Sequence, residues 1–268
     1  MNRLRQRLIF ERFLVRVFAV LGESATLKGG VVLEMRLARA RATKDVDLRC
    51  TGSPDSLLKH LQSAGRRDEG DHLFFEVNLT SDGGMLEGEG ILYEGRRFRA
   101  EARLANSPYG DPFGVDAAFG DMMTGEVEHL EGSDLLSFAG LPRSRLRVYP
   151  RETHIAEKLH AYTLPRGREN SRVKDLPDVA LLAQTGAFTR TRLRAALERT
   201  FAFRGTHPLP GSMPSPPTFW NTLYARMARD HELPWPTLAD VHRAASAFMA
   251  PVLGSGGETW NPERWTWE

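Results

Sequence analysis

The chain has 268 residues, of which 41% are hydrophobic and 26% are charged. This composition is typical of a globular protein, long enough for one large or two small cores, and the formal net charge of +2 is too small to indicate a nucleic-acid partner. The single cysteine, Cys50, excludes an internal disulfide and a cysteine metal cluster, and we interpret it as a small apolar residue rather than a nucleophile.

The amino-terminal stretch predicts a helix packed on a sheet, because apolar residues recur at helical spacing over residues 3–21 and Gly22 ends the pattern. The stretch is charged and amphipathic, without the apolar core of a signal peptide. No apolar run in the chain is long enough to span a membrane. We therefore expect a cytoplasmic protein with no membrane partner.

The strongest functional pattern follows this helix. A short apolar strand ends at Lys28, the pair Gly29-Gly30 breaks it, and a compact helix follows. Asp45 and Asp47 then lie two apart in a second extended run, so their carboxylates point to one face of a strand. Carboxylate oxygens suit a hard cation such as Mg²⁺, and free N–H groups at a helix start suit phosphate. We therefore expect a site for a metal-bound nucleoside triphosphate.

The next part of the chain predicts more strands. Asp116 lies in the middle of one of them, among apolar neighbours, where a charge is expensive to bury without a partner. We take Asp116 as a third metal ligand beside Asp45 and Asp47. The predicted elements are a helix over 54–65, strands over 73–79, 113–119 and 145–149, and a hairpin that joins 90–93 to 96–104.

From Pro150 onward the pattern becomes helical. A connector rich in proline and glycine covers 205–217, and the tail carries three tryptophans, which indicates that it docks on a surface. The predicted helices cover about 151–164, 173–185, 189–202, 217–231 and 237–250.

A second group of charged residues lies in this helical part. Lys158 is on the first of these helices, and a lysine there is a flexible point charge that suits a triphosphate. Arg172 and Lys174 add positive charge to the same pocket. Asp175 either orients Lys158 or takes a proton from an attacking hydroxyl, and Asp178 is either a helix cap or an ion-pair partner.

Taken together, the motifs resemble the nucleotidyl transferase AbiEii/AbiGii toxin family, which is part of the DNA polymerase β-like nucleotidyltransferase superfamily. The resemblance covers roughly residues 10–185 in the right order. The family often has Gly-Ser where this chain has Gly29-Gly30, and an aromatic residue where it has Pro177. Neither departure removes a charged group. The residues that carry the resemblance are Lys28-Gly29-Gly30, Thr43-Lys44-Asp45-Val46-Asp47, Asp116, Glu157-Lys158 and Arg172-Val173-Lys174-Asp175-Leu176-Pro177-Asp178.

The resemblance implies an α+β fold, with an N-terminal polymerase β-like nucleotidyltransferase mixed sheet and flanking helices, followed by a C-terminal α-helical domain. We expect residues 1–150 to form the catalytic domain and residues 151–268 to form a helical domain that completes the active site. The implied enzyme moves a nucleoside monophosphate from a nucleoside triphosphate (NTP) to an acceptor. Asp45, Asp47 and Asp116 would hold two Mg²⁺ ions.

The resemblance also implies roles for the phosphate-binding groups. Gly29 and Gly30 would let the triphosphate approach the backbone, and Lys28 either contacts phosphate or faces solvent. Lys158 would neutralise charge on the leaving pyrophosphate. Arg172 or Lys174 would support it.

Some relatives act on the 3′ end of tRNA as the toxin of a toxin–antitoxin pair, so we expect an RNA acceptor and a cognate antitoxin. One alternative is transfer to a protein or a small molecule. Another is a catalytically silent relative that binds a nucleotide or a partner, although the three carboxylates argue against it.

Overall fold

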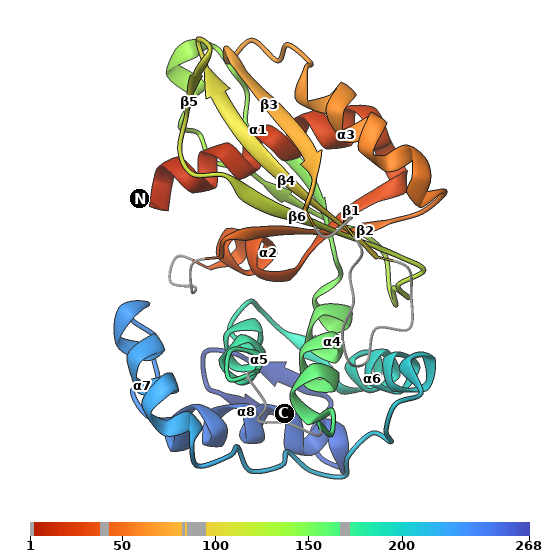
Figure 1. The fold of residues 1–268 in the computed structure, drawn as a ribbon. Coiled ribbons are helices and arrows are strands. Elements are labelled where there is room, and N and C mark those ends of the chain that lie inside the picture. Colours follow the sequence, from red (N-terminus) through yellow and green to blue (C-terminus); the bar gives the residue numbers. More distant parts are fainter. Residues whose placement is uncertain (1–2, 38–42, 82–83, 85–94, 167–171) are drawn as a thin grey trace. The chain divides into compact units, whose positions relative to one another are not determined.

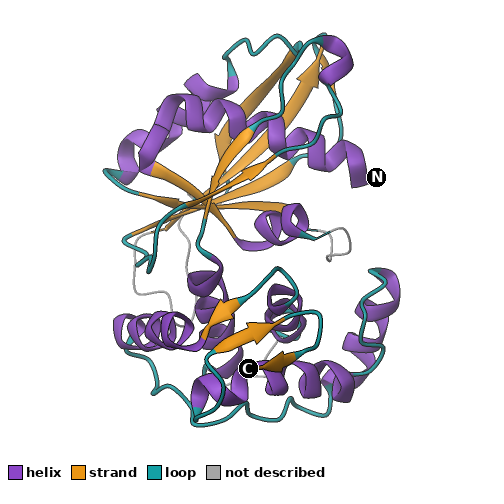
Figure 2. Cartoon of the chain, turned by 180° about the vertical axis from the view of Figure 1, so that it is seen from behind, coloured by secondary structure: helices purple, strands orange, loops and turns teal. Residues whose placement is uncertain are grey.

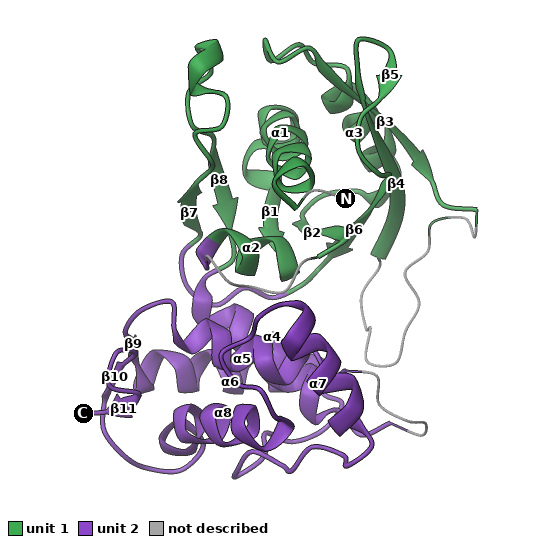
Figure 3. Ribbon diagram, turned by 90° about the vertical axis from the view of Figure 1, so that its left-hand side faces the viewer, with its two compact units in different colours: residues 1–35, 42–121, 127–149 green, residues 36–41, 122–126, 150–268 purple. Residues whose placement is uncertain are grey.

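A computed structural model describes residues 3–37, 43–81, 84, 95–166 and 172–268 of the chain. The structure divides into two compact units (Figure 3). Unit 1 comprises Met1–Met35, Ala42–Asp121 and Val127–Tyr149, and unit 2 comprises Arg36–Arg41, Met122–Glu126 and Pro150–Glu268.

Unit 1 is built on a mixed sheet, which has eight strands within the described residues (Figure 1). The strand order is β3-β4-β6-β2-β1-β8-β7, and β5 pairs with β4. β2 with β6 and β1 with β8 are parallel pairs, and the remaining pairs are antiparallel. The mixed sheet confirms the predicted fold class. The strands are β1 (Ala25–Lys28), β2 (Asp45–Cys50), β3 (Leu73–Leu79), β4 (Gly95–Leu104), β5 (Ser107–Pro108), β6 (Phe113–Phe119), β7 (Glu128–Glu131) and β8 (Arg145–Val148).

Helices α1 (Arg3–Leu21) and α3 (Leu57–Gly65) supply most of the helical side chains of a core that they share with one face of the sheet, and α2 (Gly29–Arg36) adds Val31 and Val32. Phe13 of α1 lies 5.3 Å from both Phe75 and Phe113, measured between ring centroids. Burying an aromatic side chain of this kind contributes about 1.5–3 kcal/mol. The apolar face that the spacing predicted for α1 is therefore the face that packs on the sheet.

The other face of the sheet carries polar side chains, and we call it the polar face. Side chains alternate along a strand, so Val46 and Leu48 enter the core while Asp45 and Asp47 point to the polar face. The same alternation places Asp116 there, between core residues of β6. The third helix of this region, α2 (Gly29–Arg36), begins directly after β1.

Two parts of unit 1 differ from the prediction or lie beyond it. Strand β7 was not predicted, because its four residues, Glu128–Glu131, have an intermediate-to-exposed pattern without buried apolar positions. It pairs with β8 at the edge of the sheet. The first strand of the predicted hairpin, 90–93, lies outside the described residues, whereas its second strand is β4.

Unit 2 contains the five helices that the apolar spacing predicted (Figure 2). Its core includes α5, every residue of which is buried. Throughout the described part of the chain, no helix is long and apolar enough to cross a membrane. The helices are α4 (Arg151–Thr163), α5 (Asp175–Ala183), α6 (Arg190–Arg204), α7 (Trp220–Asp230) and α8 (Leu238–Leu253).

Unit 2 also contains a small antiparallel sheet, which was not predicted. Strands β9 (Phe188–Thr189), β10 (Thr259–Asn261) and β11 (Thr266–Trp267) are too short to show an alternating pattern in the sequence. Trp260 is fully buried, and its indole N–H donates to the Ala183 carbonyl at 2.8 Å. The tryptophan-rich tail therefore docks on its own unit.

Candidate active site

The register of the sheet places Asp47 beside Asp116. Strands β2 and β6 run parallel and pair these two residues directly, so their side chains leave the polar face from strands about 4.8 Å apart. Asp45 lies two residues before Asp47 on the same face and is exposed. The three predicted metal ligands therefore come from one face of two adjacent strands.

The first turn of α2 approaches these acids closely. Gly29 has a φ of +72°, and a Cβ atom at this position would overlap the carboxylate of Asp47. A Cβ atom on Gly30 would lie 2.7 Å from the Thr43 hydroxyl. On the other side, a Cβ atom on Gly114 would lie 2.6 Å from Oδ1 of Asp45. Glycine is needed at this turn because a side chain would overlap its neighbours. The backbone of the turn therefore lies close to the acidic group, by which we mean Asp45, Asp47 and Asp116.

Lys28 lies opposite Asp47 on strand β1. It forms an ion pair with the buried carboxylate of Asp121, and it lies 5.6 Å from the ring centroid of Tyr149. Arg49 donates to the Asp121 carbonyl at 2.7 Å. The Lys28 side chain is only 12% exposed. Sequence reasoning missed Asp121, which follows β6 without any motif of its own.

Arg97 is a second residue that sequence reasoning missed. It lies opposite Asp116 on strand β4, and its guanidinium holds both carboxylate oxygens. Nε donates to Oδ1 at 2.7 Å, and Nη2 donates to Oδ2 at 2.6 Å. The sequence shows an arginine-rich strand here, but the partner of each arginine depends on the strand register.

The donors fit a divalent cation by type, because Mg²⁺ prefers carboxylate oxygens and all three predicted ligands are carboxylates on one face of the sheet. Their arrangement fits less well. Within the residues that the structure describes, no group of three or more His, Cys, Asp or Glu side chains could hold a metal ion as arranged. Both oxygens of Asp116 already accept hydrogen bonds from Arg97.

The second predicted cluster lies in unit 2. Lys158 lies 3.1 Å from Oδ1 of Asp175 and 2.9 Å from Oδ2 of Asp178, and both carboxylates are buried. Arg172 lies 3.9 Å from Oδ2 of Asp175. Both acids occupy the first turn of α5, where the helix dipole favours negative charge. Lys174 immediately precedes this turn and is exposed.

Cys50 is excluded as a nucleophile by its surroundings. Its side chain is buried in the core of unit 1, and burial raises the pKa of the thiol to about 12. A thiol with this pKa remains protonated at neutral pH, and only the thiolate is a good nucleophile.

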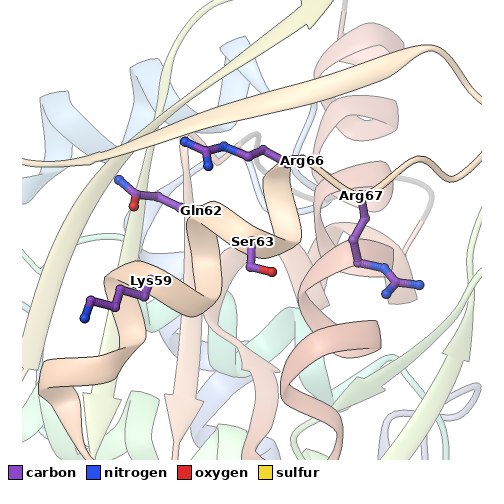
Figure 4. Close-up of a pocket in the computed structure, with 5 residues that line it drawn as sticks. All are labelled: Lys59, Gln62, Ser63, Arg66 and Arg67. Atoms are coloured by element: carbon purple, nitrogen blue, oxygen red, sulfur yellow. The ribbon is translucent and has the colours of Figure 1, made fainter.

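A basic hollow of about 380 Å³ lies on α3 (Figure 4). Helix α3 packs on the core face of the sheet through Leu57 and Leu61, so the hollow is on the opposite side of unit 1 from the polar face. Its side chains suit an anion, but they are not part of the acidic group. The lining residues are Lys59, Gln62, Ser63, Arg66 and Arg67.

Comparisons with solved structures find similar proteins from Helicobacter pylori. JHP933 shares 17% sequence identity over 75% of this chain and 78% of its own, with a TM-score of 0.47. An H. pylori protein provisionally described as a nucleotidyltransferase shares 14% identity over 94% of both chains, also with a TM-score of 0.47. A comparison with curated proteins gave no match.

A family model gives the clearest result. The model described as "Nucleotidyl transferase AbiEii toxin, Type IV TA system" matches residues 12–250, which is most of the 268-residue chain. The matched range includes every residue of the acidic group on the polar face and of the lysine cluster in unit 2. The chain therefore belongs to the AbiEii family of nucleotidyl transferase toxins of type IV toxin–antitoxin systems.

Proposed function

We propose that this nucleotidyltransferase moves a nucleoside monophosphate from an NTP to the 3′ end of tRNA in a Mg²⁺-dependent reaction. Family membership supplies the reaction class, the NTP substrate and an antitoxin as partner. The observation that supports the Mg²⁺-dependent step is the direct register of Asp47 with Asp116, with Asp45 on the same face. An RNA substrate of this kind also implies that the reaction takes place in the cytoplasm.

In this proposal Asp45, Asp47 and Asp116 hold two Mg²⁺ ions. When bound, the metal neutralises charge on the phosphate and activates the attacking oxygen. The turn at Gly29 and Gly30 binds the polyphosphate through backbone N–H groups, because a helix start carries free donors and a positive dipole end. The close approach of this turn to Asp47 supports placing the two groups in one site.

The family resemblance gives the remaining roles to the cluster in unit 2. Lys158 neutralises charge on the leaving pyrophosphate, with Arg172 or Lys174 in support. Asp178 positions Lys158, since its carboxylate lies 2.9 Å from the ammonium group. Asp175 takes the proton of the attacking hydroxyl. Its Oδ1 holds Lys158, whereas its buried Oδ2 accepts no hydrogen bond from the described residues, which supports this second role.

The test of the acceptor is an incubation of the protein with each labelled NTP, Mg²⁺ and one of three acceptors: total RNA, total protein or an aminoglycoside. We expect label in the tRNA fraction, at the 3′ end. Label in protein or in the aminoglycoside would show that this molecule, rather than RNA, is the acceptor. Absence of transfer to all three would identify a catalytically silent relative.

The test of the acidic group is the variant Asp45→Asn, which keeps the side-chain size and removes the charge. We expect transfer to fall by about 10²-fold or more, because a metal ligand is lost. The unfolding temperature should not change, since Asp45 is exposed. The matched control is Glu101→Gln, which removes another acid from the polar face, on β4. Full activity of a folded Asp45→Asn protein would overturn the assignment.

A further inference from the structure

Arg97 and Asp116 form a geometrically matched pair on the polar face. Each of two guanidinium nitrogens donates to a different carboxylate oxygen, at 2.7 and 2.6 Å. The two residues are direct partners in the antiparallel pairing of β4 with β6, so the backbone itself places them side by side. Bidentate pairs of this kind are stronger and more directional than single hydrogen bonds.

The same carboxylate has an acidic neighbour on its other side. Asp47 is its direct partner across β2 and β6, and Lys28 of β1 is the direct partner of Asp47, so one row of the sheet reads Lys28, Asp47, Asp116, Arg97. Acids at directly paired positions of neighbouring strands, whose backbones lie about 4.8 Å apart, repel each other, and the Arg97 guanidinium beside Asp116 offsets that repulsion. Arg97 therefore stabilises the row without a metal ion.

We propose that Arg97 is a built-in counter-ion of Asp116 that competes with a divalent cation for this carboxylate, so that Arg97 sets the metal affinity of the site. This inference rests on the proposed function, because it takes the three acids as metal ligands. The Arg97 guanidinium occupies two of the about four lone-pair sites of the Asp116 carboxylate, and its positive charge repels a divalent cation. Arg97 and a metal ion therefore compete for Asp116.

The exposure of the pair shows that displacement is feasible. The Arg97 side chain is 47% exposed and that of Asp116 is 18% exposed. A partly exposed ion pair contributes little net free energy, because water solvates both charges well when they separate. Once released, the guanidinium is solvated at the surface, so it remains a competitor of moderate strength rather than a block.

Arg99 provides a matched control for this inference. It lies on the same face of the same strand, two residues from Arg97, and its side chain is 62% exposed. Its direct partner on β6 is Gly114 rather than an acid, and its nearest carboxylate contact, with Glu101, is 4.0 Å long. Arg99→Gln therefore removes the same charge from the same strand without freeing Asp116.

The experiment measures Mn²⁺ binding by electron paramagnetic resonance of the free ion, without nucleotide. We expect Arg97→Gln to bind Mn²⁺ about three- to tenfold more tightly than the unaltered protein, because a competing cation and its repulsion are removed. Arg97→Lys should lie between the two, since lysine keeps the charge but not the bidentate geometry. Arg99→Gln should bind as the unaltered protein does.

A second readout is thermal stability. In chelator, Arg97→Gln should unfold at a lower temperature than the unaltered protein, because Asp116 loses its bidentate counter-ion. Mn²⁺ should raise the unfolding temperature of Arg97→Gln by more than it raises that of the unaltered protein.

The variant Asp47→Asn separates the two ways in which the inference can fail. If Asp47→Asn abolishes Mn²⁺ binding while Arg97→Gln binds as the unaltered protein does, or more weakly, the role of Arg97 is wrong and the metal site stands. If Asp47→Asn binds Mn²⁺ normally, or if neither the unaltered protein nor Arg97→Gln binds it, the metal site of the proposed function fails and the inference fails with it.

Discussion

At Gly29 a left-handed backbone angle coincides with a close approach to Asp47. We predict that Gly29→Ala lowers the free energy of unfolding by about 1–3 kcal/mol, from backbone strain and from the overlap of the new Cβ with the carboxylate. Transfer activity should fall further than stability accounts for, because Asp47 must move. Urea denaturation and the labelled-NTP assay measure the two effects.

The control for that variant is Gly22→Ala. Gly22 also has a positive φ, +52°, but a Cβ atom there would meet nothing within 4 Å. Gly22→Ala should therefore lower the free energy of unfolding only through backbone strain, by about 1 kcal/mol, and should keep its transfer activity. Equal loss of activity in the two variants would contradict a specific role for the space beside Asp47.

Lys158 is a shared counter-ion of two buried carboxylates, those of Asp175 and Asp178. We predict that Lys158→Ala lowers the free energy of unfolding by about 3–5 kcal/mol, because breaking a buried pair leaves the buried carboxylates with less compensating charge. The double variant Lys158→Ala with Asp178→Asn should recover part of that loss in urea denaturation. An unchanged stability of Lys158→Ala would contradict the pairing.

This coupling changes how the catalytic role of Lys158 has to be tested. Loss of activity in Lys158→Ala would reflect both a missing phosphate contact and a weakened fold. Lys158→Arg keeps the positive charge for the two carboxylates, and arginine differs from lysine in its planar, delocalised charge. A well-folded Lys158→Arg protein with reduced transfer would separate catalysis from stability.

Among the elements, helix α1 is tied to the start of β3 by a buried ion cluster. Arg16, which is fully buried, and Arg12 both donate to the carboxylate of Asp71, and the Leu73 N–H donates to it as well. Burial alone would raise the pKa of Asp71, but the hydrogen bonds from Arg16, Arg12 and Leu73 lower it from 3.8 to about 2. The cluster therefore depends on an ionised carboxylate.

This lowered pKa predicts a pH dependence of stability. The unfolded chain takes up the Asp71 proton first as the pH falls, so the contribution of Asp71 is complete above about pH 4 and is lost toward about pH 2. In urea denaturation, the stability difference between the unaltered protein and Asp71→Asn should therefore narrow below about pH 4. Asp111→Asn, at an exposed position, is the control. A difference that stays constant down to about pH 3 would contradict the prediction.

The elements that the sequence predicted well are those with a long apolar period. Helix α1 shows a helical stripe over many turns, and the core strands β2 and β6 show apolar residues on either side of an acid. The elements it missed are short: β7 has four residues without a buried stripe, and β11 has two. Such segments become strands only because a partner strand is already in place.

At the scale of the whole molecule, each unit has its own core and its own charged cluster. The carboxylates of the polar face belong to unit 1, and Lys158 with its two acids belongs to unit 2. The units are not continuous in the sequence, since Met122–Glu126 belongs to unit 2 although both flanking segments belong to unit 1. A boundary drawn at one position of the chain describes such an arrangement only approximately.

The order of the motifs was enough to reveal the resemblance to the family, which implied the reaction class, because a glycine turn, a pair of alternating acids and a later acid are local patterns that the sequence shows without the fold. It also determined which face of β2 carries Asp45 and Asp47, since alternation along a strand is a property of the backbone. The helices of unit 2 were predictable because their apolar residues recur at helical spacing.

Only the tertiary structure decided what each charged group faces. Asp47 meets Asp116 because β2 and β6 are neighbours in one register, and Arg97 holds Asp116 because β4 lies next to them in another. Lys28 pairs with Asp121, which is 93 positions away in the chain. Register and strand order come from packing of the whole sheet, and a shift of one residue would turn every side chain to the opposite face.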